Sequence, residues 1–387
     1  MQLFIGHLSN MQKWTNLSYA NVATTSPKAH QIALEWSESL ARGGAAEFDA
    51  DAEKKGMIPL RTATSKLLEC PISDICVSSS ATEILCSLAW AIAPKKGANI
   101  VSTKASFPST VYPWKRVSEE FGAEIKLAPH NENYYTKPED MFSLIDENTA
   151  VVTISHVEYA CGQRYDLKSF AKAAHDVGAL FIVDATQSMG MVPINARDTG
   201  ADAIVASGYK WLRGTYGAAV GYIAPEIQSL SPGIIGFRSH KDIWNMKAER
   251  LEFPKDASRF EFTTIHFGAA LGLAESINEI TNLGIQKVWE YDVKLTNILI
   301  ESALESGLEI ASPTNDNERS AIVSLKIPDG FDTGEVVKQL QDEYGILVTN
   351  RSGFLRVSPH IDNTPEQITF FLTSLRKILN IRTSKET

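Results

Sequence analysis

Residues 181–217, FIVDATQSMGMVPINARDTGADAIVASGYKWLRGTYG, are the stretch on which the interpretation of the whole chain depends. The apolar run 180–183 predicts a β-strand that ends on the carboxylate of Asp184. A second apolar run, 203–206, predicts another strand, which leads through Ser207 to Lys210. Because the carboxyl ends of parallel strands meet at one edge of a sheet, we expect the acid and the amine to lie close together.

An acid and a lysine in this arrangement have a specific chemical use. A lysine amine can hold pyridoxal phosphate as a Schiff base, and a carboxylate can keep the pyridine nitrogen of that cofactor protonated, so that its ring accepts electrons. The sequence therefore indicates pyridoxal 5′-phosphate as cofactor, with Lys210 and Asp184 as the catalytic residues.

Strand-like and helix-like segments alternate from residue 75 to residue 223, which predicts an α/β fold with a mainly parallel sheet and helices on both faces. One helical stretch is expected over 49–68, and a long one over 267–306 with a break at Gly284. Strands and helices restart after it. We therefore expect an N-terminal arm (1–20), a large cofactor-binding domain (21–265), and a long connecting helix with a smaller α+β domain (266–387).

A second candidate site follows the apolar run 75–77, where Ser78-Ser79-Ser80-Ala81-Thr82-Glu83 precedes a helical segment. Exposed N–H groups at a helix start bind anions such as phosphate. The alternative is a capping box, since Ser80 is followed three residues later by Glu83. In a chain that also carries the lysine segment, the phosphate site is the favoured interpretation.

Composition excludes several classes of protein. The chain has 387 residues, 44% of them hydrophobic and 21% charged, and a net charge of -9. The negative charge and the lack of a basic run argue against nucleic-acid binding. No apolar segment is long enough to cross a membrane, and no signal-peptide pattern opens the chain, so a cytoplasmic protein is expected. Four scattered cysteines indicate neither a disulfide framework nor a metal site.

Several short motifs, taken in chain order, resemble the class V aminotransferase family, which belongs to the fold type I pyridoxal phosphate enzymes. This family includes cysteine desulfurases, kynureninases and isopenicillin N epimerase-like proteins. The resemblance extends over nearly the whole chain. The matching pieces are Ser80–Glu83, Phe107–Ser109, Ser155–Val157, Asp184 with Gln187, Lys210, Arg259–Glu261 with Thr264, and Arg356–His360.

The resemblance implies a role for each residue around the cofactor ring. Lys210 would form the Schiff base and then, once freed, move protons. Asp184 would pair with the ring nitrogen, Gln187 would donate to the phenolate oxygen, and Phe107 would stack on the ring face.

The resemblance also implies how the phosphate is held. Ala81 and Thr82 at the helix start would bind it together with Ser207. Thr264 matches a position that in relatives contacts the phosphate from the neighbouring subunit, so a homodimer with composite active sites is expected.

For the substrate, the resemblance implies an α-amino acid whose α-carboxylate is bound by Arg356, because a planar guanidinium matches a planar carboxylate. Tyr159 stands where an asparagine is expected after Ser155–Val157, and we assign it to substrate binding. Tyr209 stands where desulfurases often have histidine. Both tyrosines place the chain closer to the non-desulfurase branch.

One departure from the family bears directly on the reaction. Desulfurases carry a nucleophilic cysteine on a long loop before the carboxylate arginine, whereas the segment 348–356 is short and no cysteine follows Cys161. Without a thiolate there is no acceptor for sulfur, so a persulfide-forming desulfurase is not expected.

The sequence leaves the reaction open. We expect a transaminase or a C–S/β-elimination lyase acting at Cα or Cβ of an amino acid, with an epimerase or another biosynthetic reaction as the alternative. A catalytically silent binding protein on the same fold is the alternative from another class. That alternative would require loss of Lys210 or Asp184, and both residues are present.

Overall fold

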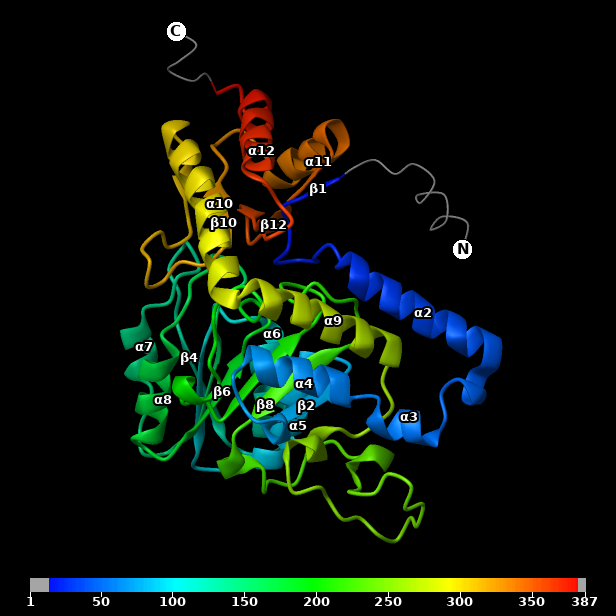
Figure 1. Cartoon of the computed structure of the whole chain (residues 1–387). Coiled ribbons are helices and arrows are strands. Elements are labelled where there is room, and N and C mark those ends of the chain that lie inside the picture. The colour runs from blue at the N-terminus through cyan, green and yellow to red at the C-terminus, as the bar shows by residue number, and fades with distance from the viewer. Residues whose placement is uncertain (1–13, 382–387) are drawn as a thin grey trace.

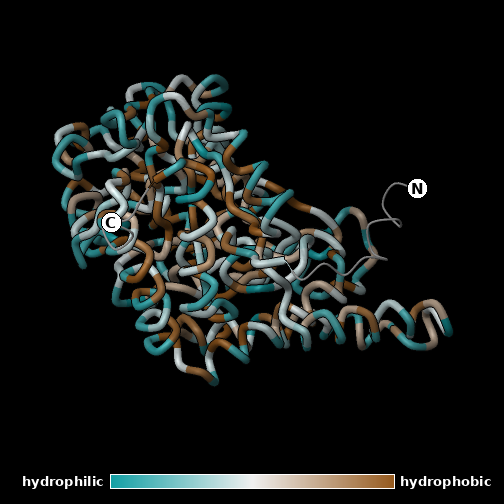
Figure 2. Tube along the Cα trace, turned by 90° about the horizontal axis from the view of Figure 1, so that it is seen from above, coloured by the Kyte–Doolittle hydropathy of each residue, from teal (hydrophilic) through white to brown (hydrophobic). Residues whose placement is uncertain are grey.

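The computed structural model describes residues 14–381, so most of the predicted N-terminal arm lies outside the described residues. The described chain forms two main hydrophobic cores, a large one around a central sheet and a smaller one built mainly from residues after 294. A third, small cluster contains Tyr19, Trp211 and Ile322. The central sheet and the smaller C-terminal unit are drawn in Figure 1. Hydrophobic and hydrophilic residues alternate along most segments of the chain trace (Figure 2). The predicted α/β architecture, with a smaller α+β unit at the C-terminal end, is confirmed.

The central sheet has seven strands in the order β2-β8-β7-β6-β5-β3-β4. Only β8 runs opposite to the other six strands, so the two antiparallel pairs are β2–β8 and β8–β7, and the prediction of a mainly parallel sheet is confirmed. Three strands, β2, β3 and β8, are buried at every position, and β5, β6 and β7 at all positions but one, as expected for a sheet covered on both faces. Their bounds are β2 Ile75–Ser78, β3 Asn99–Thr103, β4 Glu124–Ala128, β5 Thr149–Ser155, β6 Leu180–Asp184, β7 Ala203–Ser207 and β8 Ala219–Ile223.

Helices cover the two faces of this sheet (Figure 1). The helical stretch expected over 49–68 is wrong as a single element, because it divides into two helices at Gly56 and Met57. Pro59 lies in the first turn of the second helix, where its missing N–H costs nothing. The helices are α3 Ala50–Lys55, α4 Ile58–Leu67, α5 Ala81–Ile92, α6 Pro108–Phe121, α7 Pro138–Phe142 and α8 Leu167–His175.

The long connecting region belongs to both cores. Helix α9 (Phe267–Leu283) packs against α2 (Pro27–Gly43) and α4, whereas α10 (Ile285–Glu305) packs against α12 (Pro365–Ile378). The predicted break at Gly284 is confirmed, and its φ of 87° is in the region that favours glycine. The two helices thereby join the large sheet to the smaller domain.

The smaller domain has an antiparallel sheet in the order β12-β13-β10-β9, which packs against α10 and α11, and α12 packs against these two helices. A separate parallel pair joins β1 to β11, so the described start of the chain is attached to this domain. The bounds are β1 Thr15–Asn16, β9 Glu309–Ile310, β10 Val323–Lys326, β11 Ile346–Leu347, β12 Thr349–Arg351, β13 Phe354–Val357 and α11 Thr333–Tyr344.

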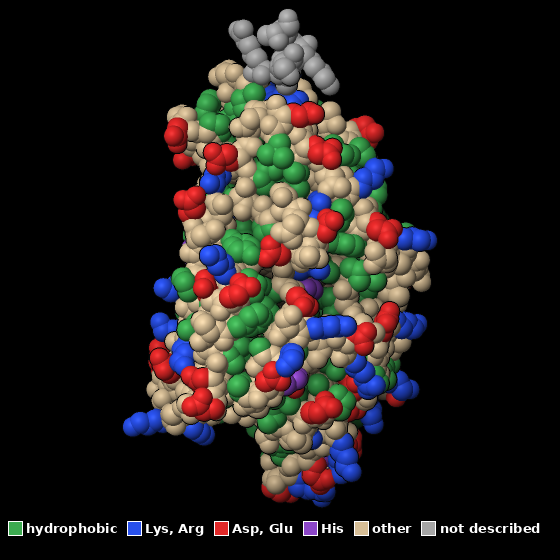
Figure 3. All heavy atoms as spheres, turned by 90° about the vertical axis from the view of Figure 1, so that its left-hand side faces the viewer, with side chains coloured by type: hydrophobic (Ala, Val, Ile, Leu, Met, Phe, Trp, Pro, Cys, Tyr) green, Lys and Arg blue, Asp and Glu red, His purple; other side chains and the backbone are tan. Residues whose placement is uncertain are grey.

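The surface shows no large area of a single charge on the face drawn in Figure 3, where acidic and basic side chains are interspersed. Over residues 14–381, none of the helices combines the length and the apolar character that a bilayer span requires. No group of three or more histidine, cysteine or acidic side chains is arranged for a metal ion in that same part of the chain.

Candidate active site

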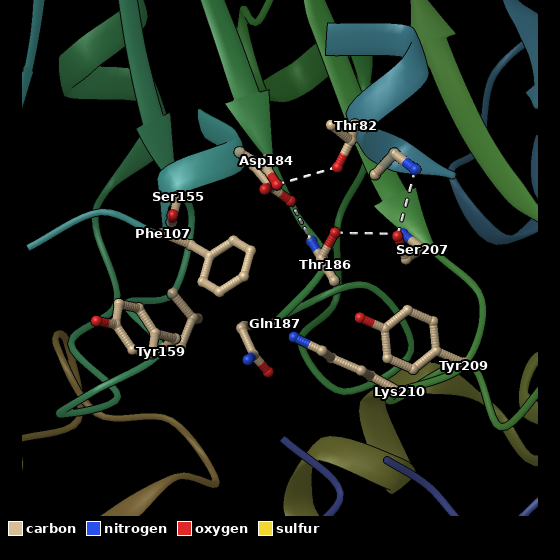
Figure 4. Close-up of a pocket in the computed structure, with 13 residues that line it drawn as sticks. Thr82, Phe107, Ser155, Tyr159, Asp184, Thr186, Gln187, Ser207, Tyr209 and Lys210 are labelled. Atoms are coloured by element: carbon tan, nitrogen blue, oxygen red, sulfur yellow. Dashed lines mark hydrogen bonds between the residues drawn. The ribbon is translucent and has the colours of Figure 1, made fainter. Parts of the chain in front are cut away.

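A cavity lies beyond the carboxyl ends of β5, β6 and β7, beside the first turn of α5 (Figure 4). It leaves about 440 Å³ of empty space, part of it open to solvent. Eight of the ten predicted site residues line it, and two, Thr264 and Arg356, do not. The eight are Ala81, Thr82, Phe107, Tyr159, Asp184, Gln187, Ser207 and Lys210, and the lining also includes Ser109, Ser155, Val157, Thr186 and Tyr209.

Lys210 follows β7 and is almost completely buried in the cavity wall. Burial lowers the pKa of its amine to about 8, because a desolvated ammonium is disfavoured. Asp184 acts in the opposite direction, while Arg356 and Arg351 lower the pKa further. Nζ lies 5.6 Å from the centre of the Phe107 ring. A substantial fraction of this amine is therefore neutral, and so nucleophilic, near neutral pH.

Asp184 is the last residue of β6 and lies beside Ser155, the last residue of β5. Its carboxylate accepts hydrogen bonds from the main-chain N–H of Thr186 at 2.9 Å and from the hydroxyl of Thr110 at 3.1 Å. Thr110 was missed by the sequence analysis, since nothing in a helix residue 74 positions away signals this contact. Thr186 was missed too, although an N–H two residues after an aspartate is a common turn pattern.

The hydrogen bonds at the start of α5 show how much of the predicted capping box forms. Ser80 caps the helix by accepting from the N–H of Glu83 at 3.3 Å. The Glu83 carboxylate does not return to the Ser80 N–H but accepts from the hydroxyls of Ser78 at 2.5 Å and Ser79 at 2.7 Å. Only half of the capping box forms, and Glu83 holds the preceding turn in place instead.

The first turn of α5 and the end of β7 form a polar corner of the cavity. Ser207 accepts from the N–H of Ala81 at 3.3 Å, and its own N–H donates to the hydroxyl of Thr186 at 3.2 Å. Thr82 donates to the hydroxyl of Ser109 at 3.0 Å. N–H groups of a first helical turn have no intrahelical acceptor, and the helix dipole favours an anion beside them. The corner is therefore suited to a phosphate.

The opposite walls carry an aromatic pair and an amide. The rings of Phe107 and Tyr159 meet edge to face, with centres 5.5 Å apart. The Gln187 side chain is held from two sides, since its Oε1 accepts from the indole N–H of Trp211 and its Nε2 donates to the main-chain oxygen of Ala20, both at 2.9 Å. Phe107, Gln187 and Lys210 lie around the same space in Figure 4.

Arg356 lies behind the wall that Tyr159 forms. Its guanidinium donates to the main-chain oxygen of Tyr159 at 2.7 Å and to the hydroxyl of Thr349 at 3.2 Å. The residue is 1% exposed, and Nη2 has no hydrogen-bond partner among the described residues. Such a buried donor is normally satisfied by a partner, and an anionic ligand beside Tyr159 would supply one.

Thr264 lies away from the cavity of its own chain, where its hydroxyl donates to Glu53 at 3.3 Å. The predicted contact of Thr264 with a neighbouring subunit's cofactor stays a prediction.

No cysteine lines the cavity. Burial raises the pKa of the Cys161 thiol to about 12, which removes its nucleophilic form at neutral pH. The hairpin between β12 and β13 turns on only Ser352 and Gly353, both at positive φ, and pairs Arg351 with Phe354. The loop that would carry a sulfur-accepting thiol is therefore a closed two-residue turn.

These features fit pyridoxal 5′-phosphate. Beside the helix start, the Ser207 hydroxyl accepts from the N–H of Ala81 and can donate its own proton to a phosphate. Lys210 offers a largely desolvated amine, and Asp184 offers an ordered carboxylate at the strand end. The unpaired Nη2 of Arg356 offers a donor for a carboxylate.

Comparisons with known proteins agree with this geometry. A family model described as Aminotransferase class-V matches residues 19–371. A probable cysteine desulfurase of Methanothermobacter thermautotrophicus is 26% identical over 93% of this chain and 94% of its own length. The apo structure of a cysteine desulfurase from Thermococcus onnurineus NA1 is 23% identical, with a TM-score of 0.85 and 95% of each chain covered. The cystine C–S lyase C-DES, solved with its product cysteine persulfide, is 18% identical, with a TM-score of 0.86, covering 94% of this chain and 98% of that one.

Proposed function

The chain belongs to the class V aminotransferase family and is a pyridoxal-phosphate-dependent transferase or lyase, and from this premise we propose that it is a lyase that cleaves the C–S bond of an α-amino acid by β-elimination. The observation that carries the proposal is a cavity that contains Lys210 and Asp184 but no cysteine. Its named relatives act on cysteine or cystine, which supports a sulfur-containing substrate. The placement of the chain nearer to the non-desulfurase branch stays a prediction from sequence.

Different residues of the cavity would have different roles in such a reaction. When bound, the cofactor supplies an electron sink for the bond that breaks at Cα. Lys210 would hold the cofactor through its amine, and the same amine would accept the proton from Cα of the substrate. A pKa of about 8 suits both duties, because the neutral and protonated forms interconvert near the working pH. Asp184 keeps the ring nitrogen protonated.

The other hydrogen-bond donors of the site would bind the phosphate of the cofactor at one end and the α-carboxylate of the substrate at the other. Ala81, Thr82 and Ser207 hold the phosphate at the start of α5. The Nη2 of Arg356 donates to the α-carboxylate of the amino acid, and Tyr159, whose main-chain oxygen already holds this guanidinium, forms the adjoining wall.

The absence of a thiol near the site changes where the sulfur goes. In a persulfide-forming desulfurase a cysteine takes the sulfur atom, but here the four described cysteines lie outside the cavity lining and the β12–β13 turn has two residues. The sulfur instead leaves together with the group bonded to it. It departs as sulfide, as a thiol or as a persulfide, according to the substrate. Transamination is the second candidate, because the Lys210 amine, with a pKa of about 8, could also deliver a proton at a carbon other than Cα if the cofactor is bound.

We also propose that the active unit is a homodimer. A surface segment between β8 and α9 exposes several large apolar side chains, which is typical of an interaction site. The position of this segment close to Thr264 supports an active site shared between the two subunits. The predicted cytoplasmic location is a separate matter and rests on the sequence alone. The exposed side chains are Ile235, Phe237, Trp244, Met246 and Leu251.

The test is incubation of the purified holoenzyme with a panel of amino acids, including cysteine and cystine, in deuterated water. Pyruvate with a released thiol or persulfide is the expected result. A keto acid that retains the substrate side chain, together with pyridoxamine phosphate, would establish transamination instead, and deuterium at Cα of recovered amino acid would establish epimerisation. Lys210→Ala should abolish every turnover and the adduct that borohydride reduction traps on the protein. A colourless protein that takes up no cofactor would overturn the proposal.

A further inference from the structure

Two hydrogen-bond partners hold the side-chain amide of Gln187 in one orientation, because each of them is compatible with only one end of the amide. The indole N–H of Trp211 can only donate, so the atom 2.9 Å away must be the amide oxygen. The main-chain oxygen of Ala20 can only accept, so the atom 2.9 Å from it must be the amide nitrogen. A flipped amide would face a donor with a donor and an acceptor with an acceptor. One N–H of the Gln187 amide is used by Ala20, and the second has no partner among the described residues.

Trp211 is itself held rigidly. Its ring is fully buried between Tyr19, whose ring centre lies 6.4 Å away, and His360, which meets it edge to face at 5.2 Å. His360 Nε2 donates to the main-chain oxygen of Trp211 at 3.1 Å, and His360 Nδ1 lies 2.7 Å from a carboxylate oxygen of Asp292. Both members of the His360–Asp292 pair are fully buried. The indole position therefore depends on α10 and on the segment after β13.

From these contacts we propose that Trp211 is a positioning residue, which together with the main-chain oxygen of Ala20 forces Gln187 to offer an N–H, and never its carbonyl oxygen, to the cavity. The buried pair of His360 and Asp292 links this arrangement to the smaller domain. The inference rests on the proposed function, because it concerns how the site treats the cofactor's ring.

The consequence is electrostatic. The ring oxygen of pyridoxal phosphate is stabilised as an anion by an N–H and destabilised by a carbonyl oxygen at the same place. With Trp211 in place, Gln187 stabilises the anion and the bound cofactor titrates at a lower pH. Without the indole N–H, only the main-chain oxygen of Ala20 opposes rotation of the amide, so the flipped orientation gains population and this stabilisation weakens.

The experiment uses the full-length holoenzyme and follows the absorbance of the bound cofactor as a function of pH. Trp211→Phe removes the N–H and keeps an aromatic ring, and we expect the titration midpoint to rise by about one pH unit. The matched control is Trp114→Phe, since Trp114 is also fully buried but its indole N–H has no partner among the described residues. In that control we expect the midpoint of wild type. Gln187→Glu should raise the midpoint at least as far, and adding Trp211→Phe to it should change little.

The outcomes separate the inference from its premise. If Gln187→Glu leaves the titration midpoint unchanged, Gln187 does not face the cofactor. That result would refute both the assignment of Gln187 to the cofactor site and the positioning role of Trp211. If Gln187→Glu shifts it but Trp211→Phe behaves as Trp114→Phe does, the positioning role alone is refuted.

A second measurement, which does not need the Trp211→Phe protein, tests the proposal if that variant fails to fold. With ¹⁵N-labelled tryptophan, the indole signal that moves in Gln187→Glu should be the one that moves when cofactor is added to the wild-type apoprotein. Two different signals would overturn the proposal.

Discussion

The amine of Lys210 should capture the cofactor with a pH dependence centred near 8. Its pKa is lowered from the ordinary value of 10.5 to about 8, chiefly by burial. That change corresponds to about 3 kcal/mol of preference for the neutral amine. At pH 7.5 about a quarter of such amines are neutral, against about one in a thousand for an ordinary lysine. Capture should therefore be about two hundredfold faster at this pH than a solvent-exposed lysine would allow.

The rate of cofactor capture should rise with pH, because the protonated amine of Lys210 is the unreactive form. Capture is slow below the pKa, rises through about pH 8 and levels off above it. The assay is stopped-flow mixing of apoprotein with pyridoxal phosphate at a series of pH values, monitored by the absorbance of the bound cofactor. Arg356→Met removes a cation that lowers the Lys210 pKa, so its midpoint should lie above that of wild type. Arg42→Met, which changes an exposed arginine on α2, is the matched control and should leave the midpoint in place.

A rate that keeps rising beyond about pH 9.5 without levelling would show that burial does not depress this pKa. A midpoint that is identical in Arg356→Met and Arg42→Met would remove Arg356 from the charges that act on the amine. Only the first result would also weaken the assignment of Lys210 as an amine active at neutral pH, because burial is the main cause of its low pKa.

Two further predictions concern buried polar contacts. His360→Ala leaves the carboxylate of Asp292 buried without its partner and should lower the free energy of unfolding, measured by urea denaturation, by about 3–5 kcal/mol. His175, about half exposed and paired with an aspartate at 2.9 Å, is the control, and its change to alanine should cost less than about 1 kcal/mol; equal losses would contradict the argument. Thr110→Val removes a donor to Asp184 and should weaken cofactor binding about tenfold or more in a titration of apoprotein, whereas Thr110→Ser should not; matching affinities would refute the role of the hydroxyl.

Local patterns were sufficient to predict much of the fold. Mostly apolar runs that end on polar side chains mark β5, β6 and β7. The strand end predicted at Asp184 is confirmed, whereas β7 extends one residue beyond the predicted 203–206 and ends at Ser207. The direction of β8 was not predictable, because an apolar run looks the same whether its neighbours are parallel or antiparallel. The division of 49–68 into two helices was missed because Gly56 and Pro59 are each tolerated near a helix end.

The site was predictable only where its residues follow the ends of strands. The sheet brings those ends together, so Asp184, Ser207 and Lys210 share one cavity as the topology requires. Thr110 and Trp211 were missed, since their roles depend on side-chain hydrogen bonds to residues 74 and 24 positions away. Such contacts arise from packing between elements and leave no mark on local periodicity.

The two domains contribute different parts of the chemistry. The residues proposed to hold the cofactor follow β2, β6 and β7 of the large sheet, whereas Arg356 and the tight turn after Arg351 belong to the small sheet. A change of loop length between β12 and β13 can therefore add or remove a sulfur acceptor without disturbing Lys210 or Asp184. The joint between the two parts is less free to change, because Gln187 contacts Trp211 and Ala20, and His360 holds Trp211 from the small-domain side. Variation in the reaction is thus easiest to accommodate in the hairpin, and substitutions at the joint should alter the cofactor's titration before they alter the choice of substrate.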